Sequence, residues 1–230
     1  MNTKPQPPRE LKVAVARISA GINQVLAQLP GVILETFRAG AKYDVIVSSG
    51  AAGKNGATGV IGDVTGEEDL TKKDDKAAVL EGSLPEGVLD AVRGGASLFF
   101  VSQSDPQTEG VAKQLAGAGA FEFKGMVGPH RAPWMGTWYF VRRHPLYDGL
   151  PVDCAMATDY QVKGNHSNGV IVDGAGVEIA VGFSRDHDRR CGAGTFTAKL
   201  GAGRIVFHRV PAMHAVFQQR FFANVLRYLS

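Results

Sequence analysis

The stretch that decides the fold is "PEGVLDAVRGGASLFFVSQSDPQTEGVAKQLAGAG", residues 85–119. It begins with a short amphipathic run closed by glycine, residues 85–95, and continues into an uninterrupted apolar run that is typical of a buried strand. Asp105 then supplies a helix cap and Pro106 the first helical position, before an amphipathic segment that ends in glycine. Helix, strand and helix in this order predict a parallel sheet between two layers of helices.

The chain before this stretch alternates in the same way. We expect strands at residues 11–18, 31–37 and 43–50, and a helix at residues 20–29, from their apolar spacing. Residues 51–85 are rich in glycine and then in charge, with little periodicity, so we expect a long irregular excursion. A loop of that length is either functional or disordered.

The second half predicts short antiparallel strands separated by Gly, Asn-Gly and Asp-Gly turns. The expected strands are residues 121–128, 136–143, 159–165, 169–174, 176–183, 194–200 and 203–210. Residues 167–182 have turn residues between two strand-like runs, which predicts a hairpin. Trp138 and Phe140 alternate along their strand, and we expect both in the core. The last segment, residues 214–229, predicts a docked helix. Its apolar stripe would consist of Val216, Phe217, Phe221, Val225 and Leu229.

Composition excludes several classes of function. The 230 residues carry a net charge of +3 without a basic run, so we expect no nucleic-acid or membrane partner. Cys154 and Cys191 lack metal-ligand spacing, and one bridge or two thiols both stay open. Residues 1–10 are polar and Pro-rich without an apolar signal, which makes the cytoplasm the default compartment and the segment linker-like. We treat residues 11–230 as a single α/β domain.

A second motif, "YFVRRHPLYDGLPVDCAMATDY" at residues 139–160, carries a family resemblance. With "KYDVIVSSG" and "ASLFFVSQ", it resembles the class I glutamine amidotransferase-like fold, nearest to ThuA-like members and to a similar domain of some family 2 glycoside hydrolases. This resemblance implies a flavodoxin-like parallel sheet with flanking helices and antiparallel additions in the second half. The matching positions are His144, Pro145, Leu146, Gly149, Leu150, Pro151, Asp159 and Tyr160.

The motif has its own physical interpretation as a corner. Pro145 keeps His144 out of the helical region, Gly149 offers a positive φ, and Pro151 stops the next element. A histidine held in this way could also line a site, so His144 and Tyr160 are candidate ligand-binding residues.

Glutamine hydrolysis is not expected. It needs a cysteine on the strand-to-helix turn and a histidine followed by glutamate, because the thiol must be activated. The corresponding turn carries Ser102, Ser104 and Asp105, and the late His208 is followed by Arg209.

A serine hydrolase is the alternative interpretation of that turn. Ser102 or Ser104 would be the nucleophile at the carboxyl end of a parallel strand, beside the ligand-binding candidates Ser48 and Ser49. The base would be His166, His187 or His208, and the carboxylate that orients it would be Asp105, Asp159 or Asp186. The competing interpretation of Ser-x-Ser-Asp-Pro is a helix cap.

Two further clusters could bind small ligands. Asp186 and Asp188 beside His187 could hold a divalent cation such as calcium, although neighbouring arginines would pair with them equally well. No other cofactor is expected. His130 and Trp134 could stack on a sugar ring.

The residues leave two functions open. The first is a non-catalytic, carbohydrate-associated accessory domain related to glycoside hydrolases, whose partners are other domains or a small ligand; a homo-oligomer is left open. The second is a small stand-alone hydrolase of ester or lactone bonds, dependent on a divalent metal in one version.

Overall fold

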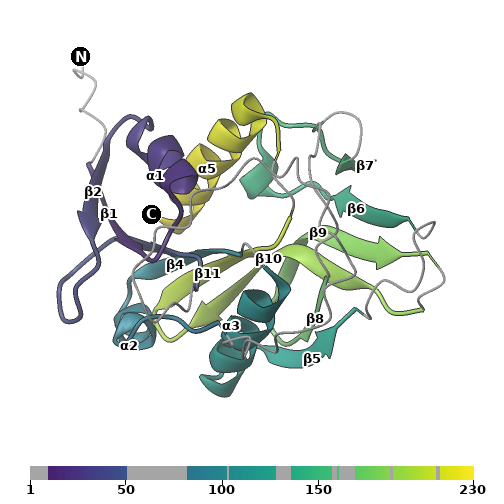
Figure 1. The fold of residues 1–230 in the computed structure, drawn as a ribbon, viewed down its shortest axis with the longest axis horizontal. Helices are drawn as coiled ribbons and strands as arrows, with labels where there is room; N and C mark the ends of the chain where they lie inside the picture. The colour runs from purple at the N-terminus through teal and green to yellow at the C-terminus, as the bar shows by residue number, and fades with distance from the viewer. Residues whose placement is uncertain are drawn as a thin grey trace, which may run out of the picture.

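A computed structural model describes residues 10–50, 82–102, 104–127, 136–156, 160, 169–186, 189–210 and 213–230. The expected excursion falls almost wholly outside these residues, as does the strand expected at 159–165 apart from Tyr160. The described residues form an eleven-stranded mixed sheet with the order β2-β1-β3-β4-β11-β10-β9-β6-β7, while β5 and β8 pair to one side (Figure 1).

Five neighbouring strands make the parallel half of the sheet. Their order is 2-1-3-4 followed by the last strand, which is the order of the flavodoxin-like fold, so the predicted fold class is confirmed. They are β2 (Val32–Thr36), β1 (Leu11–Ala16), β3 (Val45–Ser48), β4 (Ser97–Val101) and β11 (Gly203–His208), and each is parallel to its neighbour.

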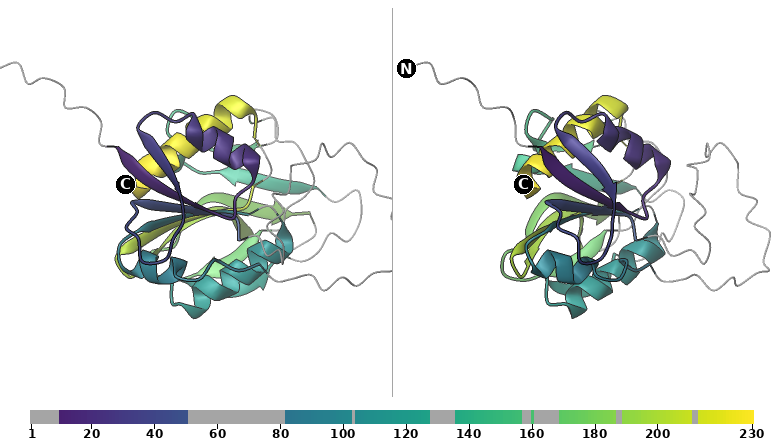
Figure 2. Two further views of the ribbon diagram at one scale, coloured as in Figure 1. Left: turned by 60° about the vertical axis from the view of Figure 1, so that its left-hand side comes forward. Right: turned by 90° about the vertical axis from the view of Figure 1, so that its left-hand side faces the viewer.

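Helices cover the parallel half on both faces. The helices α1 (Ala20–Ala27) and α5 (Ala215–Leu229) lie on one face, and α2 (Val88–Arg93) and α3 (Asp105–Gly117) lie on the other (Figure 2). The sheet therefore separates two apolar cores. The core under α5 includes Phe99, Tyr147 and Phe221, and the core under α3 includes Phe100 and Phe207.

The antiparallel half is built on β10 (Gly192–Leu200), which pairs with β11 on one side and with β9 (Glu178–Arg185) on the other. Beyond β9 follow β6 (Thr137–Val141) and the two-residue edge strand β7 (Cys154–Ala155), and a 3-10 turn, η1 (Pro145–Tyr147), lies between them in sequence.

The prediction of a hairpin at residues 167–182 is wrong. The turn itself forms, with positive φ at Gly174 and Gly176, but the strands on either side of it do not pair with each other. The strand β8 (Val170–Asp173) pairs instead with β5 (Glu122–Met126) and touches β10 at Ala193. The ladder between β10 and β11 ends at Thr195, so the start of β10 is free to accept β8.

Two expectations about exposed apolar residues are also wrong. Trp138 is 43% and Phe140 is 49% exposed, because Tyr139 and Val141 join the core under α5 and alternate residues point the other way. Val216 is 63% exposed in the first turn of α5, and Phe222 and Leu226 are buried further along.

The buried ring of Phe221 allows a test of the packing under α5. It is fully buried and contacts the rings of Phe99, His208 and Tyr147. We expect Phe221→Ala to lower the free energy of unfolding by about 3–5 kcal/mol, since it leaves a cavity that the sheet cannot close. Urea unfolding measures the change, with Val216→Ala as the exposed control, expected within about 0.5 kcal/mol of the parent. Equal effects of the two substitutions would contradict this packing.

Candidate functional site

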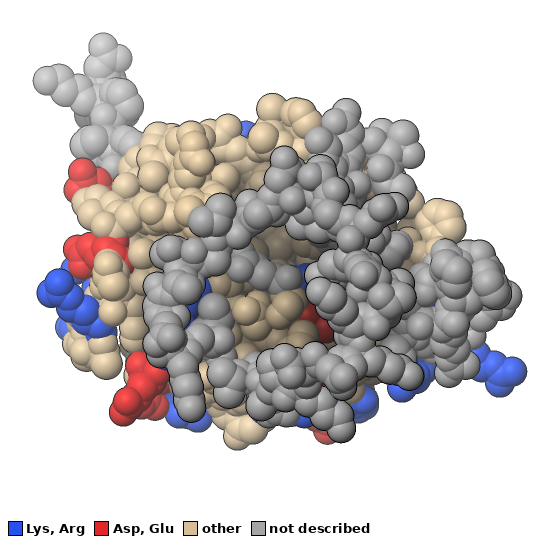
Figure 3. Space-filling view, viewed as in Figure 1, with Lys and Arg blue, Asp and Glu red and all other residues tan. Residues whose placement is uncertain are grey.

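The carboxyl ends of the parallel strands form the first candidate site, because open α/β sheets bind ligands at this edge. Described acidic and basic side chains are both visible near the centre of the face seen in Figure 3. The polar residues predicted for this edge are Ser48, Ser49, Ser102, Ser104 and Asp105, and all are described.

Ser48 and Ser49 lie at the topological switch point between β1 and β3. Both are buried, at 0% and 1% exposed. The Ser48 hydroxyl accepts a hydrogen bond from Gly50 N at 3.3 Å, and the Ser49 hydroxyl donates a short one to the carbonyl of Arg17. Arg17 follows β1 with φ +55°, so the ends of the two strands are joined by a side chain across the crevice.

The Ser102 hydroxyl belongs to the start of α3. Its oxygen lies 2.9 Å from the carbonyl oxygen of Ser104 and close to the hydroxyl of Thr108, whose oxygen lies 2.7 Å from the same carbonyl. The two hydroxyl protons are shared among these three oxygen atoms. Ser104 is the N-cap of α3 and accepts from Gln107 N at 3.4 Å. The cap interpretation therefore holds for Ser104, whereas the cap expected at Asp105 is wrong, because Asp105 is already the first residue of the helix. The Ser102 hydroxyl bonds to oxygen atoms of Ser104 and Thr108 and accepts no free amide of the helix.

Asp105 pairs with Arg209, which lies far from it in the sequence. One carboxylate oxygen accepts from Arg209 Nη2 at 2.9 Å and from Nε at 3.3 Å. Arg209 comes directly after β11, which lies next to β4, so the neighbouring strands bring the two charges together.

His208 is the described histidine nearest to this edge in the sheet. It is 4% exposed, its Nδ1 shares a hydrogen bond of 2.8 Å with Thr195 Oγ1, and that oxygen lies 3.4 Å from the hydroxyl of Tyr147. Burial, and secondly the charge of Arg209, lower the pKa of His208 to about 3. Burial also raises the pKa of the Tyr147 hydroxyl, so both groups are neutral at physiological pH.

The sheet separates Ser102 from His208. The backbone of Ser102 donates to the carbonyl of His208 at 2.9 Å, which makes the two residues close neighbours in the strand ladder. Their side chains nevertheless point to opposite faces: His208 contacts Phe99 and Phe221 under α5, and Ser102 contacts Thr108 of α3. Among the described residues, no histidine nitrogen contacts the Ser102 hydroxyl, and its catalytic role stays a prediction.

The other predicted residues are divided between described and undescribed parts of the chain. Asp186 accepts from Gly136 N and from Trp138 Nε1, both at 2.9 Å. No three His, Cys, Asp or Glu side chains within the described ranges gather around a common point, and the metal site stays a prediction.

Cys154 and Cys191 are not joined by a disulfide. The candidates outside the described residues are His130, Trp134, His166, His187 and Asp188.

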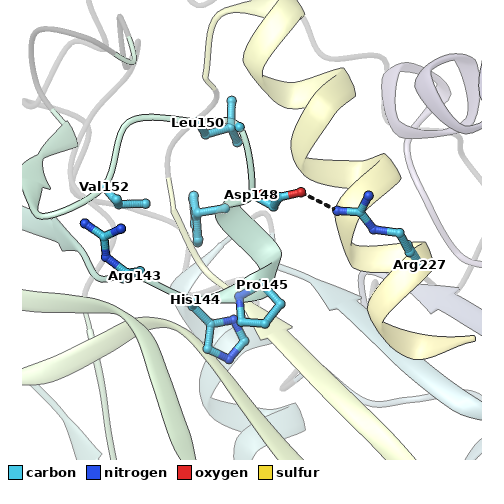
Figure 4. Close-up of a pocket in the computed structure, with 9 residues that line it drawn as sticks. Arg143, His144, Pro145, Asp148, Leu150, Val152 and Arg227 are labelled. Atoms are coloured by element: carbon cyan, nitrogen blue, oxygen red, sulfur yellow. Dashed lines mark hydrogen bonds and ion pairs between the residues drawn. The ribbon is translucent and has the colours of Figure 1, made fainter.

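The second candidate site is a pocket built by the His-Pro motif. Its volume is about 590 Å³. Arg143 and Arg227 lie on opposite sides of the other side chains of the pocket (Figure 4). The lining residues are Arg143, His144, Pro145, Tyr147, Asp148, Gly149, Leu150, Val152 and Arg227.

His144 closes one side of this pocket as the cap of η1. Its Nδ1 accepts from Leu146 N at 3.2 Å, so the proton of the neutral ring is on Nε2, which lies 3.3 Å from the Glu178 carboxylate. Burial lowers the pKa of His144 against the opposing effect of Glu178. The corner predicted from the sequence is present, with Gly149 at φ +71°.

Helix α5 holds the other side of the pocket. Asn224 is buried and donates to the carbonyls of Leu146 and Asp148, at 3.2 and 2.8 Å. Arg227 donates to the Asp148 carboxylate at 2.9 Å, the dashed contact in Figure 4. Nothing in the sequence of the motif indicates these partners, because they come from a distant helix, with a sequence separation of 76 for Asn224 and Asp148.

Tyr160 packs against the corner that residues 144–151 form. It is fully buried, its hydroxyl donates a short hydrogen bond to the carbonyl of Pro151, and its ring contacts Tyr147 and Phe217. These contacts give Tyr160 a structural role, and its role in binding a ligand stays a prediction.

The two candidate sites lie at different edges of the sheet. The last turn of α5 is bonded to the amino ends of the parallel strands, because Ser97 Oγ donates to Leu229 O at 2.9 Å and Arg204 Nη1 donates to Tyr228 O at 2.8 Å. Arg227 and the pocket therefore lie toward the amino edge, away from Ser102 at the carboxyl edge.

Comparisons with known proteins show the fold. No protein-family model matches the chain, and no curated protein matches it. Among solved structures, it is similar to a cytoplasmic protein from Salmonella typhimurium LT2 (12% identity, TM-score 0.54, covering 96% of this chain and 100% of that one). A second cytoplasmic protein from Salmonella typhimurium is 12% identical with a TM-score of 0.53, covering 95% of this chain and 98% of that one.

A larger protein contains the same fold. A beta-galactosidase from Bacillus circulans sp. alkalophilus matches with 13% identity and a TM-score of 0.51, over 96% of this chain but 31% of the enzyme's chain. At these identities the likeness establishes a flavodoxin-like α/β fold and leaves the activity open. None of the helices in the described ranges is long and apolar enough to cross a bilayer.

The buried His208 makes the stability of the protein depend on pH. Its pKa of about 3 in the folded state lies below the ordinary value of 6.5, so the unfolded chain binds a proton that the folded protein does not. We expect the free energy of unfolding to fall as the pH is lowered from about 6.5 toward 3, with a slope that approaches about 1.4 kcal/mol per pH unit for this group. Urea unfolding across that range measures it. His208→Gln removes the titration, and parallel curves for the parent and the variant would refute the assignment.

The corner depends on Asn224 for two backbone hydrogen bonds. We expect Asn224→Ala to lower the free energy of unfolding by about 1–3 kcal/mol, because the carbonyl of the buried Leu146 loses the amide donor and the carbonyl of Asp148 keeps only Arg220 Nε, at 3.2 Å. Hydrogen exchange should show faster exchange at residues 144–150. Gln219→Ala, an exposed position on the same helix, is the control. Unchanged exchange in Asn224→Ala would mean that the motif holds its shape without α5.

Proposed function

We propose that this chain is a non-catalytic accessory domain associated with carbohydrate-active proteins. The observation that carries the proposal is the match to the beta-galactosidase, in which this fold spans 31% of a longer chain. A unit that recurs as part of a larger protein is suited to packing, assembly or ligand contact. Its partners in this proposal are other domains of a glycoside hydrolase or a carbohydrate ligand.

The carboxyl edge supports a non-catalytic role. The hydroxyls of Ser49 and Ser102 bond to the chain itself. Ser49 bonds to the carbonyl of Arg17, and Ser102 bonds to Ser104 and Thr108 at the start of α3. A serine nucleophile needs a base within hydrogen-bond reach, and the described histidine of this region, His208, is on the other face of the sheet.

The His144 pocket supports ligand or domain contact at the other edge. Its wall combines the apolar Pro145 and Leu150 with the guanidinium of Arg227, a mixture that suits a polar organic molecule. We place the protein in the cytoplasm, the compartment that the names of the two Salmonella proteins give for them.

The experiment is a turnover panel with small aryl esters, lactones and aryl glycosides, with and without a chelator. We expect rates of the purified chain to stay within about tenfold of the uncatalysed reaction, whereas enzymes typically exceed it by about a millionfold. Ser102→Ala should not change these rates, since its hydroxyl bonds to Ser104 and Thr108 at the start of α3. Turnover that Ser102→Ala abolishes would instead establish the serine hydrolase, and turnover that the chelator or Asp186→Ala abolishes would establish a metal-dependent one.

A further inference from the structure

The outer face of β6 exposes two aromatic rings side by side. Trp138 and Phe140 are 43% and 49% exposed and are separated along the strand by about 7 Å, two residues at the usual rise. Large apolar side chains this exposed are rare in the described part of the chain, and the other two, Ile33 and Val216, lie on different elements. No contact with another ring is found for either aromatic within the described ranges.

The indole of Trp138 is held in one orientation. Its Nε1 donates to one oxygen of Asp186, and the other oxygen accepts from Gly136 N, both at 2.9 Å. The backbone of Asp186 donates in turn to Gly136 O at 3.0 Å, which fixes the carboxylate relative to the strand. A ring that is oriented before binding loses little conformational freedom when a ligand stacks on it.

The surface beside the rings is open. Gly182 of β9 lies opposite Phe140, and a Cβ at Gly182 would meet no atom within 4 Å. Ser184, opposite Trp138, adds a hydroxyl next to the indole. The two strands together present two exposed rings on one face, beside an unfilled position at Gly182 and the hydroxyl of Ser184.

The size of this surface decides between possible occupants. Two partly exposed aromatic side chains offer on the order of 200 Å², from the roughly 150–250 Å² that each can bury. A stable protein partner needs about 800 Å² on each side, so the rings alone are too small for a dimer or domain interface. A sugar ring, whose axial C–H groups form an apolar face with hydroxyls at the edge, matches both the area and the hydroxyl of Ser184 beside the rings.

We infer that Trp138, Phe140 and the open position at Gly182 form a stacking platform for the pyranose rings of a neutral polysaccharide. The platform rests on the proposed function and names its ligand class and its surface. Asp186 acts as a positioning residue, because it orients the indole without contacting the sugar.

The test is native affinity electrophoresis of the full chain in gels that contain hydroxyethylcellulose, galactan or xylan. We expect retardation in at least one gel, and a dissociation constant raised about tenfold or more by Trp138→Ala, as for other aromatic anchors. Gly182→Val should weaken binding similarly, because it fills the gap without removing a ring. Ile33→Ala, which removes an exposed apolar side chain elsewhere, should bind like the parent. Thermal unfolding confirms that each variant is folded.

The outcomes separate this inference from the proposed function. Retardation that survives in a folded Trp138→Ala/Phe140→Ala variant would overturn the platform and leave a carbohydrate-associated domain standing with another binding surface. No retardation of the parent in any gel would also overturn the platform, while the turnover panel alone decides whether the chain is catalytic. Self-association of the parent that the double substitution abolishes would assign the rings to a protein contact and refute the sugar site.

Discussion

The strand β11 is the constraint on which the rest of the structure depends. It runs parallel to β4 on one side and antiparallel to β10 on the other, so its two hydrogen-bonded ladders join the flavodoxin-like half to the antiparallel half. Helix α5 follows β11 and packs back across the sheet, where Asn224 holds the His-Pro corner. The corner, its pocket and the core around Phe221 all require this strand to occupy the end of the parallel ladder.

Alternation across the sheet explains why neighbours in the ladder need not share a function. Ser102 and His208 are joined by a backbone hydrogen bond, yet one side chain serves the start of α3 and the other contacts aromatic rings beneath α5. A strand gives each face to a different core, and a histidine in the α5 core is desolvated and neutral. Proximity in the strand ladder is therefore a poor guide to a catalytic pair in this fold.

The sequence predicts the local elements well because their signals are local. The strands 97–101 and 203–208 and the positive φ at Gly149 follow from apolar runs and from a glycine in a turn. The start of α3 differs from the prediction by one residue, because Ser104 caps the helix and Asp105 is its first residue. The pairing of β8 with β5 does not follow, because it depends on how far β10 extends past β11. The sequence also does not predict that Trp138 and Phe140 lie on the exposed face of β6. Alternation identifies the two faces of a strand, but it does not say which face packs under α5. For the candidate site, the corner around His144 was predictable, and its contacts with Asn224 and Arg227 were not, because nothing near the motif encodes them.

The anchoring of α5 determines how the protein presents itself to anything joined to it. The last turn of the helix is bonded to Ser97 and Arg204 at the amino edge, and β1 begins at that same edge, with Leu11 N bonded to Gly31 O. Polypeptide attached before β1 and after α5 would thus arrive on one side of the molecule. A domain attached there would lie beside the amino edge and would leave the opposite, carboxyl edge uncovered.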